Sequence, residues 1–221
     1  MFYLLLIFAT ASGAWAAHLA LIQAPADAMQ GNVQRIFYFH VPLVWVSFLA
    51  FVGGAVMSLR YLKSREMRHD DWARAFIKTG WAFTTTVLVT GPLWGKPVWG
   101  VYWNWGDERL VSFFVMWMMY NGYLLLRSTI ADFETGARIG AVLALLAVIN
   151  AALVVAAIYI WKTAQHPSPV FIQKGGSGLK DPAMSRAFWA SFSAFTLLFI
   201  SILVARLKVE RSISGSHGFH D

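Results

Sequence analysis

Four tryptophans gather in the segment 94–110, which reads WGKPVWGVYWNWGDERL. They are Trp94, Trp99, Trp103 and Trp105. Glycine and proline between them disfavour regular helix, so the rings are expected to spread over a non-helical loop. A shelf of flat aromatic faces can hold a large planar apolar ligand by stacking and burial. The alternative is an interfacial aromatic belt, the position that Trp and Tyr commonly take at membrane edges.

Two of the six histidines, His40 and His166, stand one or two residues before a proline near the end of an expected helix. A lone histidine at a membrane edge is commonly a hydrogen-bonding residue, and this alternative stays open. The chain has no cysteine, and neither histidine has a cluster of carboxylates beside it. Two imidazoles in such surroundings suit the axial positions of a haem iron better than a zinc site.

The composition of the chain indicates which elements must position these residues. Of 221 residues, 58% are apolar and 13% are charged, and the mean hydropathy is +0.55. Such a chain is typical of integral membrane proteins. Stretches that lack acidic and basic side chains over roughly 20 residues indicate transmembrane helices. The predicted spans are about 3–24, 36–59, 77–95, 109–127, 139–161 and 187–206.

The predicted fold is therefore an all-α membrane protein, a single polytopic domain over 1–221 built as a bundle of six transmembrane helices with an outward tryptophan-rich loop. The first window could instead be a signal peptide, since Ala14-Trp15-Ala16 resembles a cleavage site. It has no basic segment before it, which favours a retained helix. The charged stretch Arg60–Lys78 is expected to be a solvated connector. The spans hold no acidic or basic side chain, which argues against an ion-coupled transporter.

The distribution of basic residues predicts the orientation. One set of eleven lies in the segments between helices 2 and 3, between helices 4 and 5, and in the C-terminal tail, whereas the opposite set has seven. The larger set is expected to be cytoplasmic, which places both termini inside and the loop 94–110 with both histidines outside. The net charge of +7 does not indicate nucleic-acid binding, because the basic residues lie at membrane edges rather than in one stripe.

These residues together resemble the heme exporter protein C family (CcmC) of the cytochrome c maturation system, within a wider group of tryptophan-rich haem-handling membrane proteins. The likeness covers nearly the whole chain. It rests on the segment from Trp94 through Trp105 to Leu110, on His40 in a His-Val-Pro sequence, and on His166 after the fifth span. The family usually reads Trp-Asp-x-Arg-Leu where this chain has Gly106 inserted before Asp107.

The resemblance implies that haem b is held at the outer face of the bacterial cytoplasmic membrane and presented to a haem chaperone, CcmE. It implies an ATP-binding-cassette complex of CcmA with CcmB, and a small subunit CcmD, as further partners. It makes His40 and His166 the axial ligands of the iron. The implied haem platform is Trp94, Trp99, Trp103, Trp105 and Asp107. The cations available for the haem propionates are Arg35, Lys96 and Arg109.

The resemblance does not indicate an enzyme in the usual sense, because the covalent bond to haem forms on the chaperone. Two other functions remain as alternatives. A membrane b-type cytochrome would move electrons and would favour histidines that face each other inside a helical core. A permease or structural subunit of a transporter would use the tryptophans only as a belt and would bind no haem.

Overall fold

The computed structural model describes residues 2–160, 179 and 181–218, and its regular elements are helices. His166 lies outside these residues. Helix α1 (Phe2–His18) continues into a π-helical turn η1 (Leu19–Gln23), and the 3-10 turn η2 (Asn32–Ile36) leads into α2 (Phe37–Ser64). The later helices are α3 (Met67–Trp99), α4 (Glu108–Thr129), α5 (Phe133–Ile160) and α6 (Pro182–Ser216). The predicted all-α fold is confirmed, and each predicted span overlaps one of these helices.

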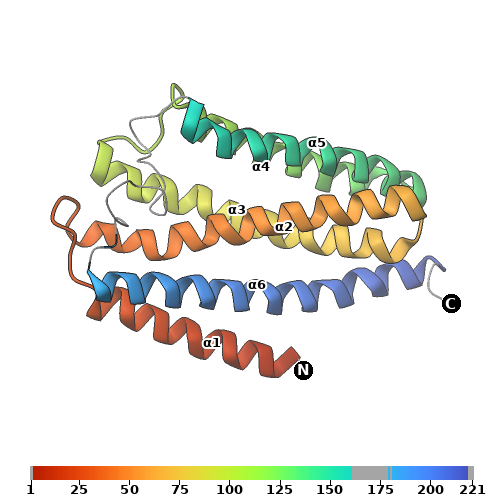
Figure 1. Cartoon of the computed structure of the whole chain (residues 1–221). Coiled ribbons are helices and arrows are strands. Elements are labelled where there is room, and N and C mark those ends of the chain that lie inside the picture. Colours follow the sequence, from red (N-terminus) through yellow and green to blue (C-terminus); the bar gives the residue numbers. More distant parts are fainter. Residues whose placement is uncertain (1, 161–178, 180, 219–221) are drawn as a thin grey trace.

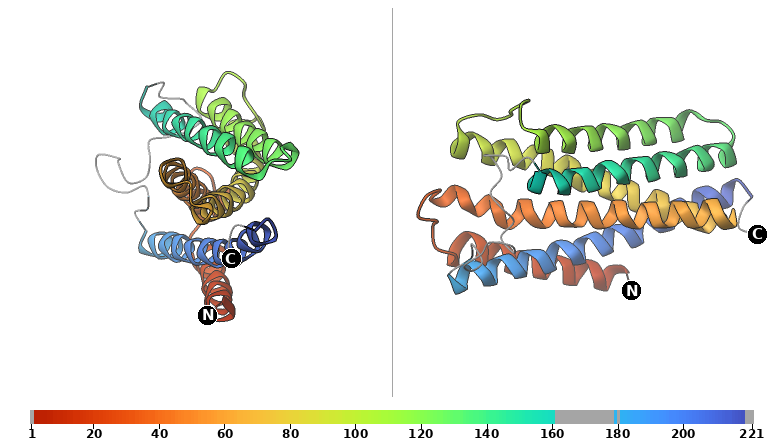
Figure 2. Two further views of the ribbon diagram at one scale, coloured as in Figure 1. Left: turned by 90° about the vertical axis from the view of Figure 1, so that its right-hand side faces the viewer. Right: turned by 45° about the horizontal axis from the view of Figure 1, so that its top comes forward.

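The helices run up and down along a common direction (Figure 1). The connections from α1 to α2 and from α3 to α4 lie at one end of the bundle. The connections from α2 to α3 and from α4 to α5 lie at the other end, towards which both termini point. The helices pack in layers, with α4 and α5 on one side, α2 and α3 in the middle, and α6 and then α1 on the opposite side (Figure 2).

Five helical segments of the described chain are long and apolar enough to cross a membrane, which makes it a multi-pass membrane protein. They are Phe2–Gln23, Asn32–Ser64, Glu108–Thr129, Phe133–Ala157 and Pro182–Ser216. Helix α3 is not among them, because charged residues fill its first turns and threonines its middle. Its 33 residues nevertheless correspond to roughly 50 Å of helix, and they lie alongside α2.

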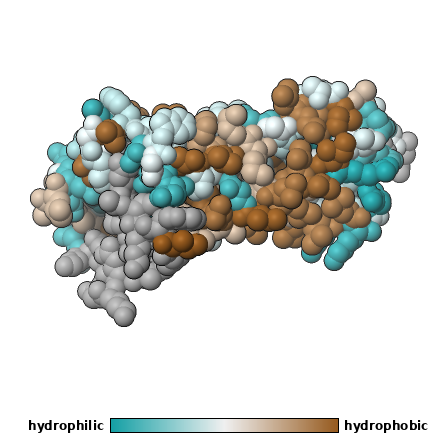
Figure 3. Space-filling view, turned by 90° about the horizontal axis from the view of Figure 1, so that it is seen from above, coloured by the Kyte–Doolittle hydropathy of each residue, from teal (hydrophilic) through white to brown (hydrophobic). Residues whose placement is uncertain are grey.

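The surface of α5 illustrates how these helices suit a bilayer. Large apolar side chains recur every three or four residues along its outward face, while the face that packs on the bundle is made of alanines. The exposed side chains are Ile139, Val142, Leu146, Ile149 and Leu153. The buried ones are Ala137, Ala141, Ala144, Ala147 and Ala151. Small residues let helices approach closely in lipid. Figure 3 shows the apolar surface that α4 and α5 present, with polar side chains at the end beyond it.

Close packing also joins the middle layer. A side chain on Gly80 of α3 would place its Cβ 2.8 Å from the Cβ of Ala50 in α2, so only glycine permits this approach. Between α2 and α4, the rings of Phe51 and Tyr120 stack with centroids 3.7 Å apart, and both are fully buried. The central core therefore locks α2, α3 and α4 together away from either end of the bundle.

A buried network of ion pairs occupies the end of the bundle where α2 meets α3. Arg74 of α3 pairs with Asp70 at 3.1 Å, with Asp71 at 2.6 Å and with Glu210 of α6 at 3.1 Å. Arg127 of α4 pairs with Asp70 at 2.9 Å. The prediction that Arg60–Lys78 is a solvated connector is therefore wrong. Only Arg65 and Glu66 connect the two helices, and the charges beyond them are buried because they neutralise one another across three helices.

Candidate functional site

A cavity of about 380 Å³ lies at the end of the bundle that holds the connection from α3 to α4. This volume falls within the range of ordinary small-molecule sites. One face of α2 and the last turns of α3 form most of the wall, and the start of α4 closes it. The lining residues that carry aromatic or polar chemistry are His40, Trp45, Phe48, Trp94, Trp99, Tyr102, Trp103, Asn104, Arg109, Phe113 and Phe192. The remaining lining is largely aliphatic.

His40 lies on this wall, near the start of α2. Its Nδ1 is 2.9 Å from the hydroxyl oxygen of Thr90 in α3. Its ring meets the ring of Trp94 edge to face, with centroids 5.7 Å apart. In the described part of the chain, no hydrogen bond engages Nε2. The imidazole is therefore held at one nitrogen and free at the other.

The tryptophans of the predicted loop divide between helix and coil. Helix α3 continues to Trp99, where Gly100 ends it in the left-handed conformation (φ 81°) and donates its N–H to the carbonyl of Lys96 at 3.0 Å. The prediction that the loop is non-helical from Trp94 onward is therefore wrong. Proline has the φ angle of a helix and removes only one hydrogen bond, so Pro97 does not stop it. Only residues 100–107 are non-helical.

Three of the predicted platform tryptophans line the cavity: Trp94, Trp99 and Trp103. The rings of Trp94 and Trp99 have centroids 6.3 Å apart at 45°, so they form adjoining walls rather than one flat shelf. The Nε1–H of Trp94 donates to Gln30 at 2.9 Å, which fixes that ring. The Nε1 of Trp103 is buried and has no hydrogen-bond partner in the described chain. An indole donor in that state requires an acceptor.

The other two predicted platform residues lie outside the cavity lining. Trp105 is 70% exposed and packs edge to face against Trp103 and Phe114. Asp107 is buried, but its carboxylate caps α4 by accepting the N–H of Leu110 at 2.9 Å. Its location follows from this capping role, since a carboxylate at a helix start satisfies otherwise unpaired N–H groups.

The inserted Gly106 is accommodated in a tight turn before α4. The side-chain oxygen of Asn104 accepts the N–H of Gly106 at 2.9 Å, and its backbone carbonyl accepts the N–H of Asp107 at 3.2 Å. A turn of this kind absorbs an extra residue without shifting the helix that follows. Asp107 and Arg109 consequently stand at the first turn of α4.

The three candidate cations occupy different environments. Arg109 lines the cavity, and its guanidinium makes no hydrogen bond or ion pair within the described residues. The ammonium of Lys96 donates to the carbonyl of Gly100 at 2.9 Å and lies over the ring of Tyr102. Arg35 donates to the carbonyls of Leu21 and Ala24, which ties the start of α2 to the end of η1. Of the three, only Arg109 is both on the cavity wall and unpaired.

Sequence reasoning did not identify Thr90 or the deeper apolar half of the cavity. A signal for both was present in the helical spacing. Thr90 precedes Trp94 by four residues, and Val44 and Phe48 follow His40 by four and eight, so each shares a face with a residue already singled out. The described residues contain no group of three or more metal-ligating His, Cys, Asp or Glu side chains. This agrees with a single imidazole on the wall rather than a zinc centre.

Comparison with known proteins decides the family. The model of the family described as Heme exporter protein C matches residues 1–215. The chain belongs to the heme exporter protein C family. A family member from Bradyrhizobium diazoefficiens is 38% identical over 190 residues, which cover 85% of this chain and 70% of that protein. The Heme exporter protein C of Escherichia coli K12 is 32% identical over 185 residues, covering 84% and 73%.

The family also extends to organelles. A putative cytochrome c biosynthesis ccmC-like mitochondrial protein of Marchantia polymorpha is 32% identical over 157 residues, covering 71% of this chain and 66% of that protein. The resemblance inferred from the tryptophan segment and the histidines is thereby confirmed at the level of the family. The residues of the site remain to be tested on this chain.

Proposed function

We propose that this chain holds haem b in the cavity beside His40, at the outer face of the bacterial cytoplasmic membrane, and presents it to the haem chaperone CcmE. Its family gives it a role in haem handling for cytochrome c maturation. The observation that carries the proposal for the site is His40, whose imidazole lines the cavity with Nδ1 engaged and Nε2 free. A neutral imidazole nitrogen in that state is a good ligand for haem iron.

The residues of the cavity fit a haem in three respects. Aliphatic and aromatic walls suit the apolar macrocycle. The unpaired guanidinium of Arg109 and the unpaired Nε1–H of Trp103 suit the propionate carboxylates. The free nitrogen of His40 suits the iron. His166, outside the described residues, is proposed as the second axial ligand.

The proposed placement in the membrane uses all six helices. Helix α3 lies beside α2 over much of its length, so we place it across the bilayer with the other five. The cavity then lies at the outer face, opposite the end to which both termini point, in agreement with the eleven-to-seven distribution of basic residues. At this face the site is accessible to a chaperone in the aqueous phase.

Delivery requires that the chain bind the cargo without modifying it. The iron supplies two axial positions that nitrogen ligands can occupy and release. The protein residues orient the haem, exclude water from its apolar face and expose one edge to the chaperone. CcmA with CcmB and the small subunit CcmD are the proposed membrane partners.

The decisive experiment is the visible spectrum of the purified chain loaded with haem, before and after addition of the apo-chaperone. We expect a low-spin Soret band that moves to the chaperone fraction when the two proteins are separated. A colourless protein after loading would identify a transporter subunit instead. Haem that is reduced by quinol but never leaves the chain would identify a b-type cytochrome.

A further inference from the structure

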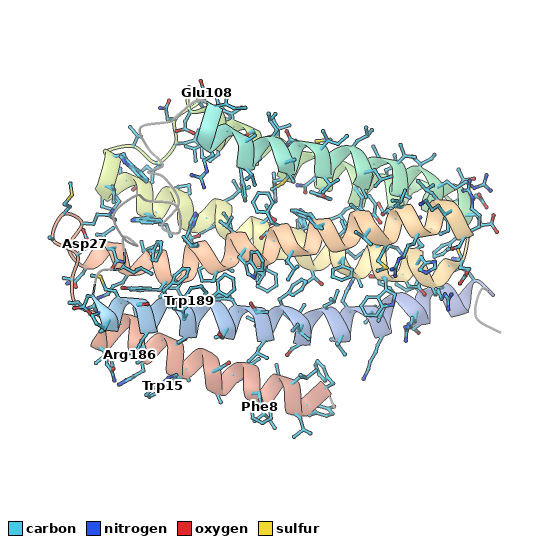
Figure 4. The ribbon with its side chains drawn as sticks, in the orientation of Figure 1. Phe8, Trp15, Asp27, Glu108, Arg186 and Trp189 are labelled. Atoms are coloured by element: carbon cyan, nitrogen blue, oxygen red, sulfur yellow. The ribbon has the colours of Figure 1, made fainter. Side chains whose placement is uncertain are left out.

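A second hollow lies on the opposite side of the bundle from the haem cavity, between α1 and α6. It is an open groove of about 680 Å³ at the same end of the molecule, and none of its lining residues lines the haem cavity. Its walls combine Trp15 and Gln23 from α1 and η1 with Ser185, Arg186 and Trp189 from α6. Figure 4 shows Trp15 and Arg186 near the end that also holds Asp27 and Glu108.

Arg186 gives this groove its charge. Its side chain is exposed, and its guanidinium forms no ion pair or hydrogen bond with the rest of the described chain. The hydroxyl of Ser185 and the amide of Gln23 line the same groove. An arginine beside two uncharged hydrogen-bonding groups favours an anion with several oxygens, since the guanidinium fork matches phosphate geometry.

Two tryptophans flank the charge and set its depth in the membrane. Trp15 is 58% exposed and Trp189 is 50% exposed, although both lie on helices that cross the bilayer. Half-exposed tryptophans at helix ends mark the level of lipid headgroups. Trp15 stacks on His18 at 5.8 Å between ring centroids, and His18 Nε2 lies 3.2 Å from Gln23 Nε2, which orders this wall. A phosphate at Arg186 would therefore lie at headgroup depth.

The backbone of this wall is also unusual. Residues Leu19–Gln23 form a π-helical turn, closed by a 2.8 Å hydrogen bond from Ala24 N–H to the carbonyl of Leu19. Such wide turns are frequent at functional sites. Both Leu19 and Gln23 line the groove, so the wide turn is what presents them there.

An apolar path continues from the groove along α1. Leu4, Ile7 and Phe8 are each at least 60% exposed, and Figure 4 shows Phe8 farther along α1 from Trp15 and Arg186. A surface of this kind at membrane depth contacts hydrocarbon chains. A polar, positively charged pocket at headgroup level with an apolar path below it has the shape and chemistry of one phospholipid.

We propose that the groove between α1 and α6 is a binding site for an anionic phospholipid of the outer leaflet. Arg186 pairs with the headgroup phosphate, Ser185 and Gln23 donate hydrogen bonds to its oxygens, and the acyl chains follow the exposed side of α1. The proposal does not depend on haem binding. It adds a lipid site on the opposite side of the bundle from the cavity.

The test is native mass spectrometry of the full chain released from nanodiscs that contain equal amounts of phosphatidylglycerol and phosphatidylcholine. We expect phosphatidylglycerol to remain bound preferentially to the wild type. Arg186→Gln should reduce that retention at least about tenfold, because a hydrogen bond to a charged group is lost. Trp15→Ala should reduce it for both lipids. Lys96→Gln removes a cation at the same end of the bundle but outside the groove, and it should leave retention unchanged.

Other outcomes would overturn the proposal. Equal retention of both lipids, or equal loss in Arg186→Gln and Lys96→Gln, would mean that the groove does not select an anionic headgroup. Displacement of the lipid by excess inorganic phosphate would identify a free-anion site. A polypeptide adduct that excludes lipid would identify a docking site for a partner helix. Circular dichroism and elution volume of each variant verify that it is folded, and the haem spectrum of Arg186→Gln should match the wild type.

Discussion

Nδ1 of His40 and the hydroxyl oxygen of Thr90 lie 2.9 Å apart, although 50 residues separate them in the chain. The hydroxyl of Thr90 also lies 3.0 Å from the carbonyl oxygen of Thr86, to which it donates its one hydrogen. Its oxygen must then accept the Nδ1–H of His40. This fixes the imidazole tautomer, and it leaves Nε2 with a lone pair for iron.

The first prediction follows from that hydrogen bond. Thr90→Val keeps the shape of the side chain but removes the acceptor, and we expect haem affinity to fall about 10- to 100-fold, the usual effect of losing such a supporting contact. Thr90→Ser should restore binding. Haem titration followed at the Soret band measures both. If Thr90→Val binds like the wild type while His40→Gly loses the band, the ligand assignment stands and the orienting role of Thr90 does not.

The second prediction concerns the axial ligands. His40→Gly should bind haem weakly with a high-spin spectrum, and added imidazole should restore the low-spin spectrum by entering the vacated position. His166→Gly should behave in the same way if it supplies the other ligand. Recovery in only one variant would leave the other histidine without an axial role. An unchanged spectrum in both variants before imidazole is added would exclude both ligands.

The third prediction separates the cavity from an aromatic belt. Trp99→Ala and Trp103→Ala should each weaken haem retention by roughly 1–3 kcal/mol, the range expected for a buried or stacked aromatic ring. Trp117 is the matched control, because it donates to Thr85 at 2.9 Å and does not line the cavity. Equilibrium haem dissociation measures the three variants. Equal effects in all three would favour a belt.

The fourth prediction assigns the propionate contact. Arg109→Gln should lower haem affinity about tenfold or more, whereas Lys96→Gln should not, because Lys96 already donates to Gly100. The sharper measurement repeats the titration with haem dimethyl ester, which has no carboxylate. The ester should bind wild type and Arg109→Gln alike. A persistent difference with the ester would show that Arg109 acts through packing.

The fifth prediction concerns the buried ion pairs. Arg74→Leu leaves three carboxylates without their shared partner, and we expect it to lower the free energy of unfolding by about 3–5 kcal/mol. Arg138→Leu breaks the exposed pair with Glu134 and should cost less than about 1 kcal/mol. Unfolding by SDS in mixed micelles measures both. Similar effects would mean that the network is not load-sharing.

The sequence indicates the helices of this fold well because charge-free stretches are a local property. It fails at the start of α3, where Asp70, Asp71 and Arg74 look solvated and are buried. Their burial depends on Glu210, which is more than 130 residues away in the chain, and no local pattern reports such a partner. The site shows the same division between local and distant contacts.

Within the site, the aromatic segment and His40 are visible in the sequence because their residue types are rare together. The role of Asp107 was also accessible, since an aspartate directly before an apolar helix is a common N-cap. The hydrogen bond of His40 to Thr90 was not, because it depends on the pairing of α2 with α3. The choice of Arg109 over Arg35 likewise depends on which carbonyls lie near each guanidinium.

The ion pairs at one end of the bundle and the cavity at the other give the molecule the mechanics of forceps. Arg74, Arg127 and Glu210 bind α3, α4 and α6 together at the closed end. At the cavity end, α3 and α4 are joined only by the non-helical residues 100–107. Small changes in the angle between these two helices therefore produce their largest separation around the cargo, and the stiff end that faces the cytoplasm stays in place.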